Sequence, residues 1–232
     1  MSSNNLIVRS LLESMVSAVD AIDISYSMSE KGLEERLLLG WHTQNAPLDL
    51  VQGLAKDWGV PSAMRGRWRE HTESADGVGI TVNKSFSSFR LYTHHWKSVD
   101  PHSYGEVVYR GFKCLPDNTY RVDEYVYMGD LRHPNNLNYA LQACTHPERI
   151  HKLIGVCPEK VPMMFTQIKN SGRHSWLATV RHAKQDAGNV IAPQYSGHKL
   201  LHLAGGIDAS KGAFDSYYLS ANSKNAIHFL GD

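Results

Sequence analysis

The side chains best suited to chemistry alternate along one short stretch of the chain. Successive side chains of a β-strand point to opposite faces, so a strand over residues 86–96 would carry two different rows. The polar and aromatic row consists of Arg90, Tyr92, His94 and Trp96. The more apolar row, which we expect to pack against helices, consists of Phe89, Leu91, Thr93 and His95. The first row is typical of a ligand cleft, because an Arg can hold a carboxylate, a His can relay a proton and the rings can form flat walls.

The next two predicted strands, 105–114 and 119–128, form a hairpin around a Pro-Asp-Asn turn. If they line the same cleft, they add carboxylates, a second guanidinium and another aromatic wall. A Glu in partly apolar surroundings has a raised pKa and can move protons near neutral pH. We therefore predict Glu106 and His94 as the acid–base groups, with Glu124 as the alternative carboxylate. The predicted substrate-binding residues are Arg90, Tyr92, Trp96, Arg110 and Tyr120.

The alternative interpretation of these rows is structural. Cross-strand Arg–Glu pairs are common on the solvent face of a sheet, and each contributes little stability. Solvent faces rarely gather Trp, Tyr and His together, however, which favours a site for the row as a whole.

Several classes of function lack their sequence signatures. The 232 residues contain 24 Lys+Arg and 23 Asp+Glu, a net charge of +1, whereas a protein that binds the nucleic-acid backbone normally has a strong basic excess. Nucleic-acid binding through Arg65, Arg67 and Arg69 is therefore ranked last. There is no glycine-rich nucleotide loop, serine hydrolase elbow or HExxH motif. The cysteines have no CxxC spacing and the histidines have no ligand spacing, so we predict neither a metal nor a cofactor.

The chain also lacks targeting and membrane signals. No apolar run approaches the roughly 20 residues that a membrane span needs. The N-terminus has neither the charged nor the apolar region of a signal peptide. We expect a cytoplasmic protein with reduced thiols and no membrane partner.

Helical periodicity dominates the first sixty residues. Apolar residues recur at three- and four-residue steps between residues 8 and 22, which predicts a first helix. Ser29 is placed to cap a second helix that runs to Trp41, and Pro47 and Gly59 are placed to bound a third. Residues 61–77 then read as a loop.

From Val78 onward the apolar period changes to two, which is typical of strands. We predict strands near 78–82, 86–96, 105–114, 119–128, 161–168, 174–182, 198–204, 214–220 and 226–230, with a helix pair that begins at Pro134 and Pro147. The fold class is α+β, in which N-terminal helices precede a largely antiparallel curved sheet or half-barrel with an inserted helix pair. The domain organisation is a helical segment 1–60, a loop 61–77 and an antiparallel α+β domain 78–232, which together form one structural unit.

The size, the lack of cofactor motifs and the order Arg, His, Glu across residues 90–106 resemble the bacterial Pictet–Spengler cyclases that build β-carbolines from tryptophan. The resemblance covers the middle third of the chain. It implies a cofactor-independent homodimeric enzyme of specialised metabolism that condenses an aromatic amino acid or arylethylamine with an aldehyde. It also implies that Glu106 is the base, and that Arg90 and His94 hold the substrate carboxylate or steer the second substrate.

Two alternatives remain open. One is an aromatic prenyltransferase-like barrel enzyme, which would need a basic set of side chains to hold a diphosphate. The other is a non-catalytic protein that binds a small molecule in an apolar pocket.

Overall fold

The computed structural model describes residues 3–96, 104–115, 117, 119–168, 173–208 and 212–231. Its strands are β1 (Ala21–Ser29), β2 (Gly32–His42), β3 (Gly77–Asn83), β4 (Phe89–His94), β5 (Val107–Cys114), β6 (Tyr120–Asp130), β7 (Pro162–Ile168), β8 (Arg173–Thr179), β9 (Leu200–Asp208) and β10 (Gly212–Ser220). Its α-helices are α1 (Ser3–Val16), α2 (Leu48–Asp57), α3 (Ser62–Thr72), α4 (Pro134–Gln142), α5 (Pro147–Val156), α6 (Ala187–Val190) and α7 (Ser223–Gly231). The short 3-10 helices that lie wholly within the described residues include η1 (Thr43–Asn45), η3 (Arg181–Ala183) and η4 (Pro193–Tyr195).

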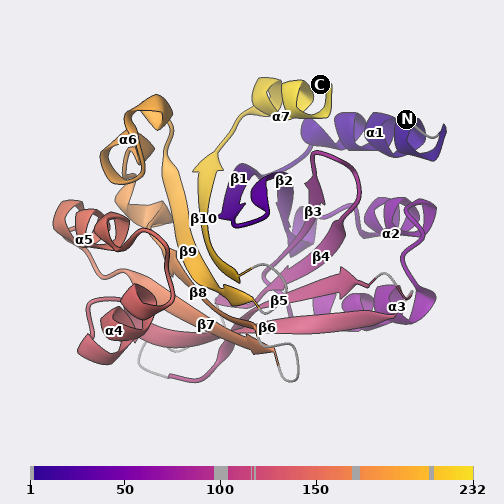
Figure 1. Cartoon of the computed structure of the whole chain (residues 1–232). Coiled ribbons are helices and arrows are strands. Elements are labelled where there is room, and N and C mark those ends of the chain that lie inside the picture. Colours follow the sequence, from indigo (N-terminus) through magenta and orange to yellow (C-terminus); the bar gives the residue numbers. More distant parts are fainter. Residues whose placement is uncertain are drawn as a thin grey trace.

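The strands form a closed antiparallel barrel (Figure 1). Its order is β1-β10-β9-β8-β7-β6-β5-β4-β3-β2, so that every strand pairs with its neighbours in the sequence. The first and last strands close the barrel, with Asp23 opposite Ser220 and Ser29 opposite Phe214. The predicted antiparallel curved sheet and its inserted helix pair are confirmed. The sheet goes beyond a half-barrel, because strands from the N-terminal segment complete it.

The predicted second helix, from Ser29 to Trp41, is wrong. These residues form the turn of the first hairpin and most of β2. Leu37, Leu39 and Trp41 are almost fully buried, and they alternate with residues of the inner face at the period of a strand. Gly32 adopts φ +104° in the turn, a conformation that favours glycine and that no helix would require.

Two other predicted elements differ from the structure. The loop predicted at 61–77 contains α3, whose polar outer side hides the helical period, although Met64 and Trp68 are fully buried. The strand predicted at 226–230 lies in α7, where Ala226, Phe229 and Leu230 form the buried side. Their spacing of three and four residues is that of a helix.

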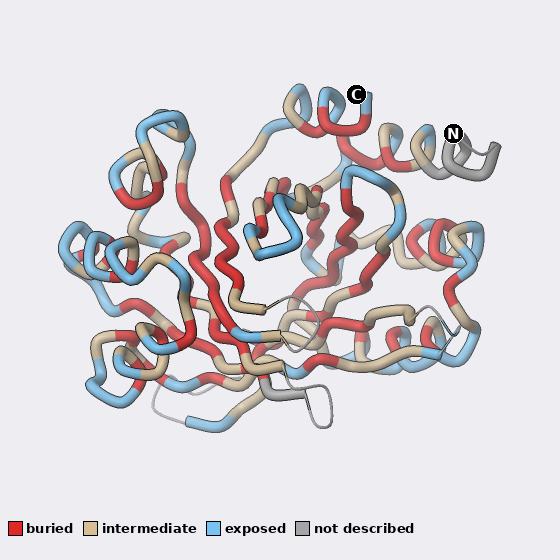
Figure 2. Tube along the Cα trace, viewed as in Figure 1, coloured by how far each residue is buried: buried red, intermediate tan, exposed pale blue. Residues whose placement is uncertain are grey.

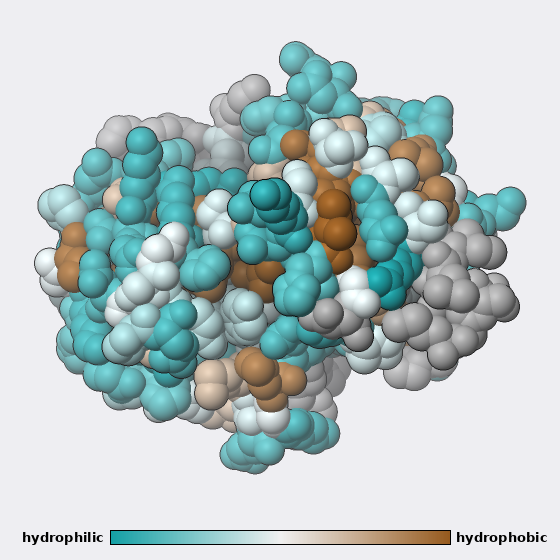
Figure 3. All heavy atoms as spheres, turned by 90° about the horizontal axis from the view of Figure 1, so that it is seen from above, coloured by the Kyte–Doolittle hydropathy of each residue, from teal (hydrophilic) through white to brown (hydrophobic). Residues whose placement is uncertain are grey.

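The hydrophobic cores lie between the barrel and its helices. One core packs α1, α2, α3 and α7 against β2, β3 and β4, and contains Leu12, Leu54 and Leu91. The other packs α4, α5 and α6 against the strands on the opposite side, and contains Leu153 and Val190. Burial therefore concentrates along the strands and on one side of each helix (Figure 2). The face seen from above is mostly hydrophilic, with apolar side chains in separate patches (Figure 3).

Within the residues that the structure describes, no helix combines the length and the apolar character that crossing a membrane requires.

Trp68 connects the helical layer to the strand that carries the predicted site. It is fully buried, and its Nε1 donates a hydrogen bond of 3.1 Å to the Tyr92 carbonyl oxygen. We expect Trp68→Ala to lower the free energy of unfolding by about 3–5 kcal/mol, because it leaves a cavity and an unpaired carbonyl. Trp68→Phe should cost less than half as much, and Arg67→Ala on the exposed side of α3 should cost almost nothing. Urea unfolding of the three variants gives these values, and equal losses for both Trp68 variants would contradict this account.

Candidate functional site

A cavity of about 370 Å³ lies inside the barrel. Because side chains of a strand alternate, each strand sends every second residue inward. Rings of Tyr92, Trp96, Tyr109, Tyr125 and Tyr218 line much of the wall. A smaller hollow of about 30 Å³ shares several of the lining residues and adds Arg90 and Arg173.

The structure places the alternating row from the sequence analysis on the inner side of the barrel. Tyr92, His94 and Trp96 line the large cavity, and Arg90 lines the adjoining hollow. The opposite row faces outward, with Phe89 and Leu91 in the helix-covered core. The Trp96 Nε1 donates a hydrogen bond of 2.6 Å to the Tyr109 hydroxyl, which fixes two of the rings. The roles assigned to these side chains stay predictions.

Gly111 leaves room for the ring of Tyr92. It lies opposite Tyr92 on the neighbouring strand, and a Cβ at this glycine would lie 3.0 Å from the Tyr92 Cε1. The absence of a side chain at Gly111 therefore lets the Tyr92 ring lie across β5.

Arg110 and Tyr120 do not reach the cavity. His94 pairs with Tyr109, so the odd-numbered residues of β5 share the inner face and Arg110 lies on the outer face. There the Arg110 Nε donates a hydrogen bond of 3.0 Å to the Glu124 Oε1. Tyr120 packs against the helix-covered core. The placement of Arg110 and Tyr120 in the cleft is therefore wrong, because the sequence does not reveal which face of one strand lies beside which face of the next.

Glu106 lies just before β5 and is half-buried. Its carbonyl oxygen accepts a hydrogen bond of 2.8 Å from the backbone of Tyr127, and a bulge follows between Val107 and Tyr109. Glu106 is not among the described residues that line the cavity. Glu124 is on the outer face, and half of its side chain is exposed. The proton-transfer role of Glu106 stays a prediction.

A set of basic side chains occupies one end of the barrel interior, and sequence reasoning found only one member. Arg36 and Arg173 line the smaller hollow with Arg90. Strand pairing of Arg90 with Lys113, and of Lys113 with Arg121, places these two residues on the same inner face. The set therefore consists of Arg36, Arg90, Lys113, Arg121 and Arg173, from five different strands.

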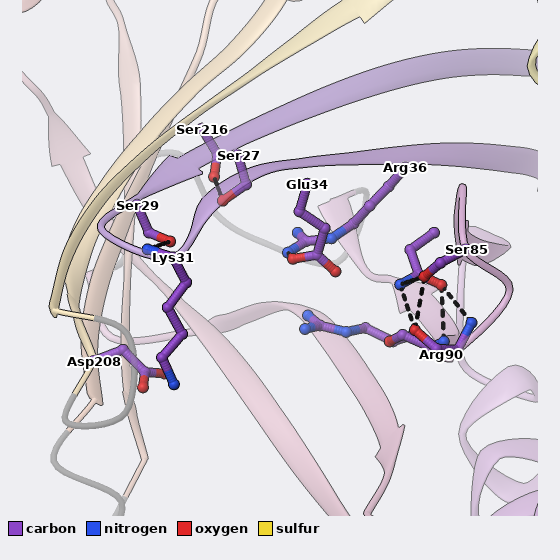
Figure 4. Close-up of polar contacts among 12 residues, drawn as sticks. Ser27, Ser29, Lys31, Glu34, Arg36, Ser85, Arg90, Asp208 and Ser216 are labelled. Carbon is purple, nitrogen blue, oxygen red and sulfur yellow. Dashed lines mark hydrogen bonds and ion pairs between the residues drawn. The ribbon is translucent and has the colours of Figure 1, made fainter.

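Acidic side chains pair with some of these cations. Arg36 forms an ion pair with Glu34, Arg121 pairs with Asp123 at 2.9 Å, and Arg173 pairs with Asp208 at 3.6 Å. Figure 4 shows Glu34, Arg36 and Arg90 reaching into the same part of the barrel.

Arg90 differs from the paired arginines. It is 6% exposed, and its only polar contact with the described residues is a long one of 3.5 Å to the Tyr92 hydroxyl. Among the residues that the structure describes, no carboxylate oxygen lies within 4 Å of its guanidinium. A buried charge without a partner is costly, so this group is suited to an anionic ligand.

The other end of the cavity holds an ion pair and two imidazoles. The Arg181 Nη2 lies 3.0 Å from the Oδ2 of Asp23, which is 3% exposed. Burial raises the pKa of Asp23 to about 6, against the opposing attraction of Arg181. Burial and the charge of Arg181 lower the pKa of His94 to about 3 and that of His202 well below its usual range. At neutral pH this end therefore has an ionised carboxylate, a guanidinium and two neutral imidazoles.

The cavity residues of β1, which the sequence analysis missed, follow a recognisable pattern. In β1 the inner residues Asp23, Ser25 and Ser27 are polar, and they alternate with Ile22, Ile24 and Tyr26. This period of two was visible in the sequence, but the apolar residues before and after it also fit a helix. His202 and Arg181 had no local signal, because they reach the cavity only when the barrel closes.

Metal binding has no preformed site in the part of the chain that is described. No three His, Cys, Asp or Glu side chains there are grouped closely enough to hold an ion. The expectation of a metal-free protein stays a prediction.

Comparison with known proteins identifies the fold. No protein-family model matches the sequence, and no curated protein matches it significantly.

Among solved structures, the chain is similar to 5-dimethylallyl tryptophan synthase from Streptomyces coelicolor in complex with DMASPP and Trp. The TM-score is 0.62, with 10% identity over 96% of this chain and 90% of that one. It is also similar to 6-dimethylallyltryptophan synthase from Micromonospora olivasterospora, with a TM-score of 0.58 and 11% identity over 88% of this chain and 82% of that one. A third match is the prenyltransferase PriB in a ternary complex with L-tryptophan and dimethylallyl thiolodiphosphate, with a TM-score of 0.57 and 11% identity over 88% and 80% of the two chains. The chain thus has the fold of the tryptophan prenyltransferase barrels.

The buried carboxyl of Asp23 should make stability depend on pH. Its pKa rises from 3.8 to about 6 on folding, so the native state binds more protons than the unfolded state between these values. Stability from this group is present below about pH 4 and is lost as pH rises through 6, by roughly 3 kcal/mol in total. The free energy of unfolding of the wild type, relative to that of Asp23→Asn, should therefore fall between pH 4 and pH 7. The free energies come from urea unfolding at each pH. If they changed with pH in the same way for the two proteins, the burial of Asp23 would be contradicted.

Proposed function

We propose that this chain is an aromatic prenyltransferase, which moves a prenyl group from an allylic diphosphate to an aromatic acceptor. The observation that carries this proposal is the basic set inside the barrel, with the buried and unpaired Arg90 among its members. Glu34, Asp123 and Asp208 each pair with one arginine of the set, whereas Arg90 has no described carboxylate within 4 Å and is suited to bind a polyanion. Guanidinium groups hold phosphate oxygens through charge-assisted hydrogen bonds. The ligands of the similar prenyltransferase PriB, tryptophan and dimethylallyl thiolodiphosphate, support the same assignment.

The aromatic wall suits the intermediate of such a transfer. Tyr125 and Tyr218 line both the basic hollow and the larger cavity, and Tyr92 lies beside them. The faces of aromatic rings attract a cation, and this attraction strengthens when water is excluded. An allylic cation formed between the two regions would therefore be stabilised by rings and sheltered by the barrel.

Groups that line the cavity can take up both the diphosphate and the proton that this reaction releases. The allylic C–O bond breaks and its electron pair leaves with the diphosphate, which stays with the basic set. A carbon of the arene attacks the allylic carbon, and the proton displaced from the arene goes to a base. Asp23 is the best-placed described carboxylate, because it lines the cavity and has a pKa of about 6, near the operating pH.

Cyclisation of an aromatic amine with an aldehyde fits the cavity less well. That reaction would use Glu106, which is not among the described lining residues, and it gives the basic set no role. The neighbours support an aromatic substrate such as tryptophan and not the aldehyde. The aldehyde and the homodimer implied by the first resemblance stay predictions.

Inorganic pyrophosphate and dimethylallyl diphosphate test the basic set directly. Both should raise the melting temperature of the wild type, because they bind the native state only. Arg90→Met should fold, since it replaces an unpaired buried charge with an apolar side chain, and should weaken both ligands roughly 10- to 100-fold. The exposed Arg69→Met on α3 should behave as the wild type. An unchanged melting temperature of the wild type in the presence of both ligands would contradict the diphosphate site.

Turnover distinguishes an enzyme from a binding protein. Incubation with dimethylallyl diphosphate and tryptophan, followed by mass spectrometry, should show a prenylated product and release of pyrophosphate. Asp23→Asn should bind pyrophosphate normally but form the product at least about 100-fold more slowly, since general-base catalysis contributes at least that much. Tight diphosphate binding without a product from any arene would favour the non-catalytic alternative.

A further inference from the structure

Two imidazoles lie at the end of the cavity that holds Asp23 and Arg181, and they come from strands that are far apart in the sequence. His94 lies on β4 and His202 on β9, and both line the large cavity with Asp23 and Arg181. Aromatic rings hold each imidazole in place. The His94 ring meets Tyr109 edge-on, with ring centroids 4.6 Å apart, and the His202 ring meets Tyr218 edge-on at 5.5 Å.

Neither imidazole has a hydrogen bond or an ion pair with any residue that the structure describes. His202 is 7% exposed, and its Nδ1 is fully buried without a partner, so Nε2 is the nitrogen that can meet a ligand in the cavity. Another histidine of the barrel does have polar contacts within the protein. His95, the neighbour of His94 on the outer face, contacts the Thr93 hydroxyl at 3.0 Å and the Ser74 carbonyl at 3.3 Å. A buried polar ring that lacks such contacts weakens the fold, which points to a role outside the protein's own hydrogen bonding.

The charge around the pair determines what it can bind. Burial and the nearby Arg181 lower the pKa of both imidazoles, so each is neutral at physiological pH. A neutral imidazole has one N–H donor and one nitrogen acceptor. The pair is thus suited to a neutral polar group that donates a hydrogen bond, whereas Asp23 and Arg181 beside it are already joined to each other.

We propose that His94 and His202 recognise a ring N–H or O–H of the aromatic acceptor, and so select arenes that carry such a donor. This inference rests on the proposed function, because it assigns the acceptor of that reaction to this end of the cavity. The donor would anchor one edge of the arene at the imidazoles and turn the remaining ring toward the tyrosines and the basic set. His202 is then a positioning and specificity-determining residue.

Matched pairs of arenes test the recognition. Indole and 1-methylindole differ only by a methyl group at the donor, as do 2-naphthol and 2-methoxynaphthalene. We expect the wild type to bind the donor member of at least one pair about tenfold more tightly, which corresponds to one hydrogen bond. His202→Phe should abolish this preference, and His151→Phe on the exposed side of α5 should keep it. The proposal is overturned if the wild type binds both members of each pair equally or binds neither. It is also overturned if His202→Phe keeps the preference.

Thermal unfolding gives a second readout that a structural histidine would not produce. Removing an unpartnered polar ring in favour of an apolar ring of similar shape should raise the melting temperature of His202→Phe by roughly 2–4 °C. A lower melting temperature would mean that the imidazole supports the fold, and would overturn the proposal. The binding experiments need no diphosphate, so donor preference without prenyl transfer rejects only the proposed reaction. Prenyl transfer that is equally fast for both members of each pair rejects only the role of the imidazoles.

Discussion

Closure of the barrel by pairing β1 with β10 is the constraint on which the rest of the structure depends. In a closed antiparallel barrel every strand is paired on both sides, so alternation assigns each side chain to the inside or the outside except where a bulge shifts the register. The hairpin of β1 and β2 supplies the last two strands and brings Asp23 and Arg36 to the interior. Without it, the basic set would open to solvent and the ion pair of Asp23 with Arg181 could not form.

The same alternation places the side chains that stabilise the fold on the outer face of the barrel and the polar side chains on the inner face. The apolar outward residues pack under helices in two cores, and these cores contain most of the fully buried side chains. The inward residues are rich in arginine, tyrosine, serine and threonine, and several of their buried polar atoms lack partners, among them the Arg90 Nε, Thr81 Oγ1 and Thr166 Oγ1. Such groups cost stability. The barrel can carry them because the outer layer provides the hydrophobic burial, with Trp68 as a direct link between α3 and β4.

The sequence predicted which side chains face the barrel interior where the pattern within one strand was enough, and failed where distant strands had to meet. Alternation in residues 86–96 correctly separated the inner row of Arg90, Tyr92 and His94 from the outer row of Phe89 and Leu91. The same reasoning misplaced Arg110, because parity within a strand does not tell which face its neighbour shares. Leu33, Leu37, Leu38 and Trp41 have helical spacing, although Leu37 and Trp41 also share one face of a strand, so β2 was missed. Arg173 and His202 could not be found at all, because only closure brings β8 and β9 to the row on β4.

The two ends of the cavity differ in a way that gives a direction to any chemistry between them. At one end an unpaired guanidinium and its basic neighbours favour negative charge. At the other end burial keeps two imidazoles neutral and leaves a carboxylate whose pKa is close to neutrality. Rings from β4, β6 and β10 lie between the two ends. A reaction that separates an anionic leaving group from a proton would place each product where the barrel already holds a complementary group. This order of basic side chains, aromatic rings and carboxylate is the physical reason why we propose group transfer rather than a simple condensation in this cavity.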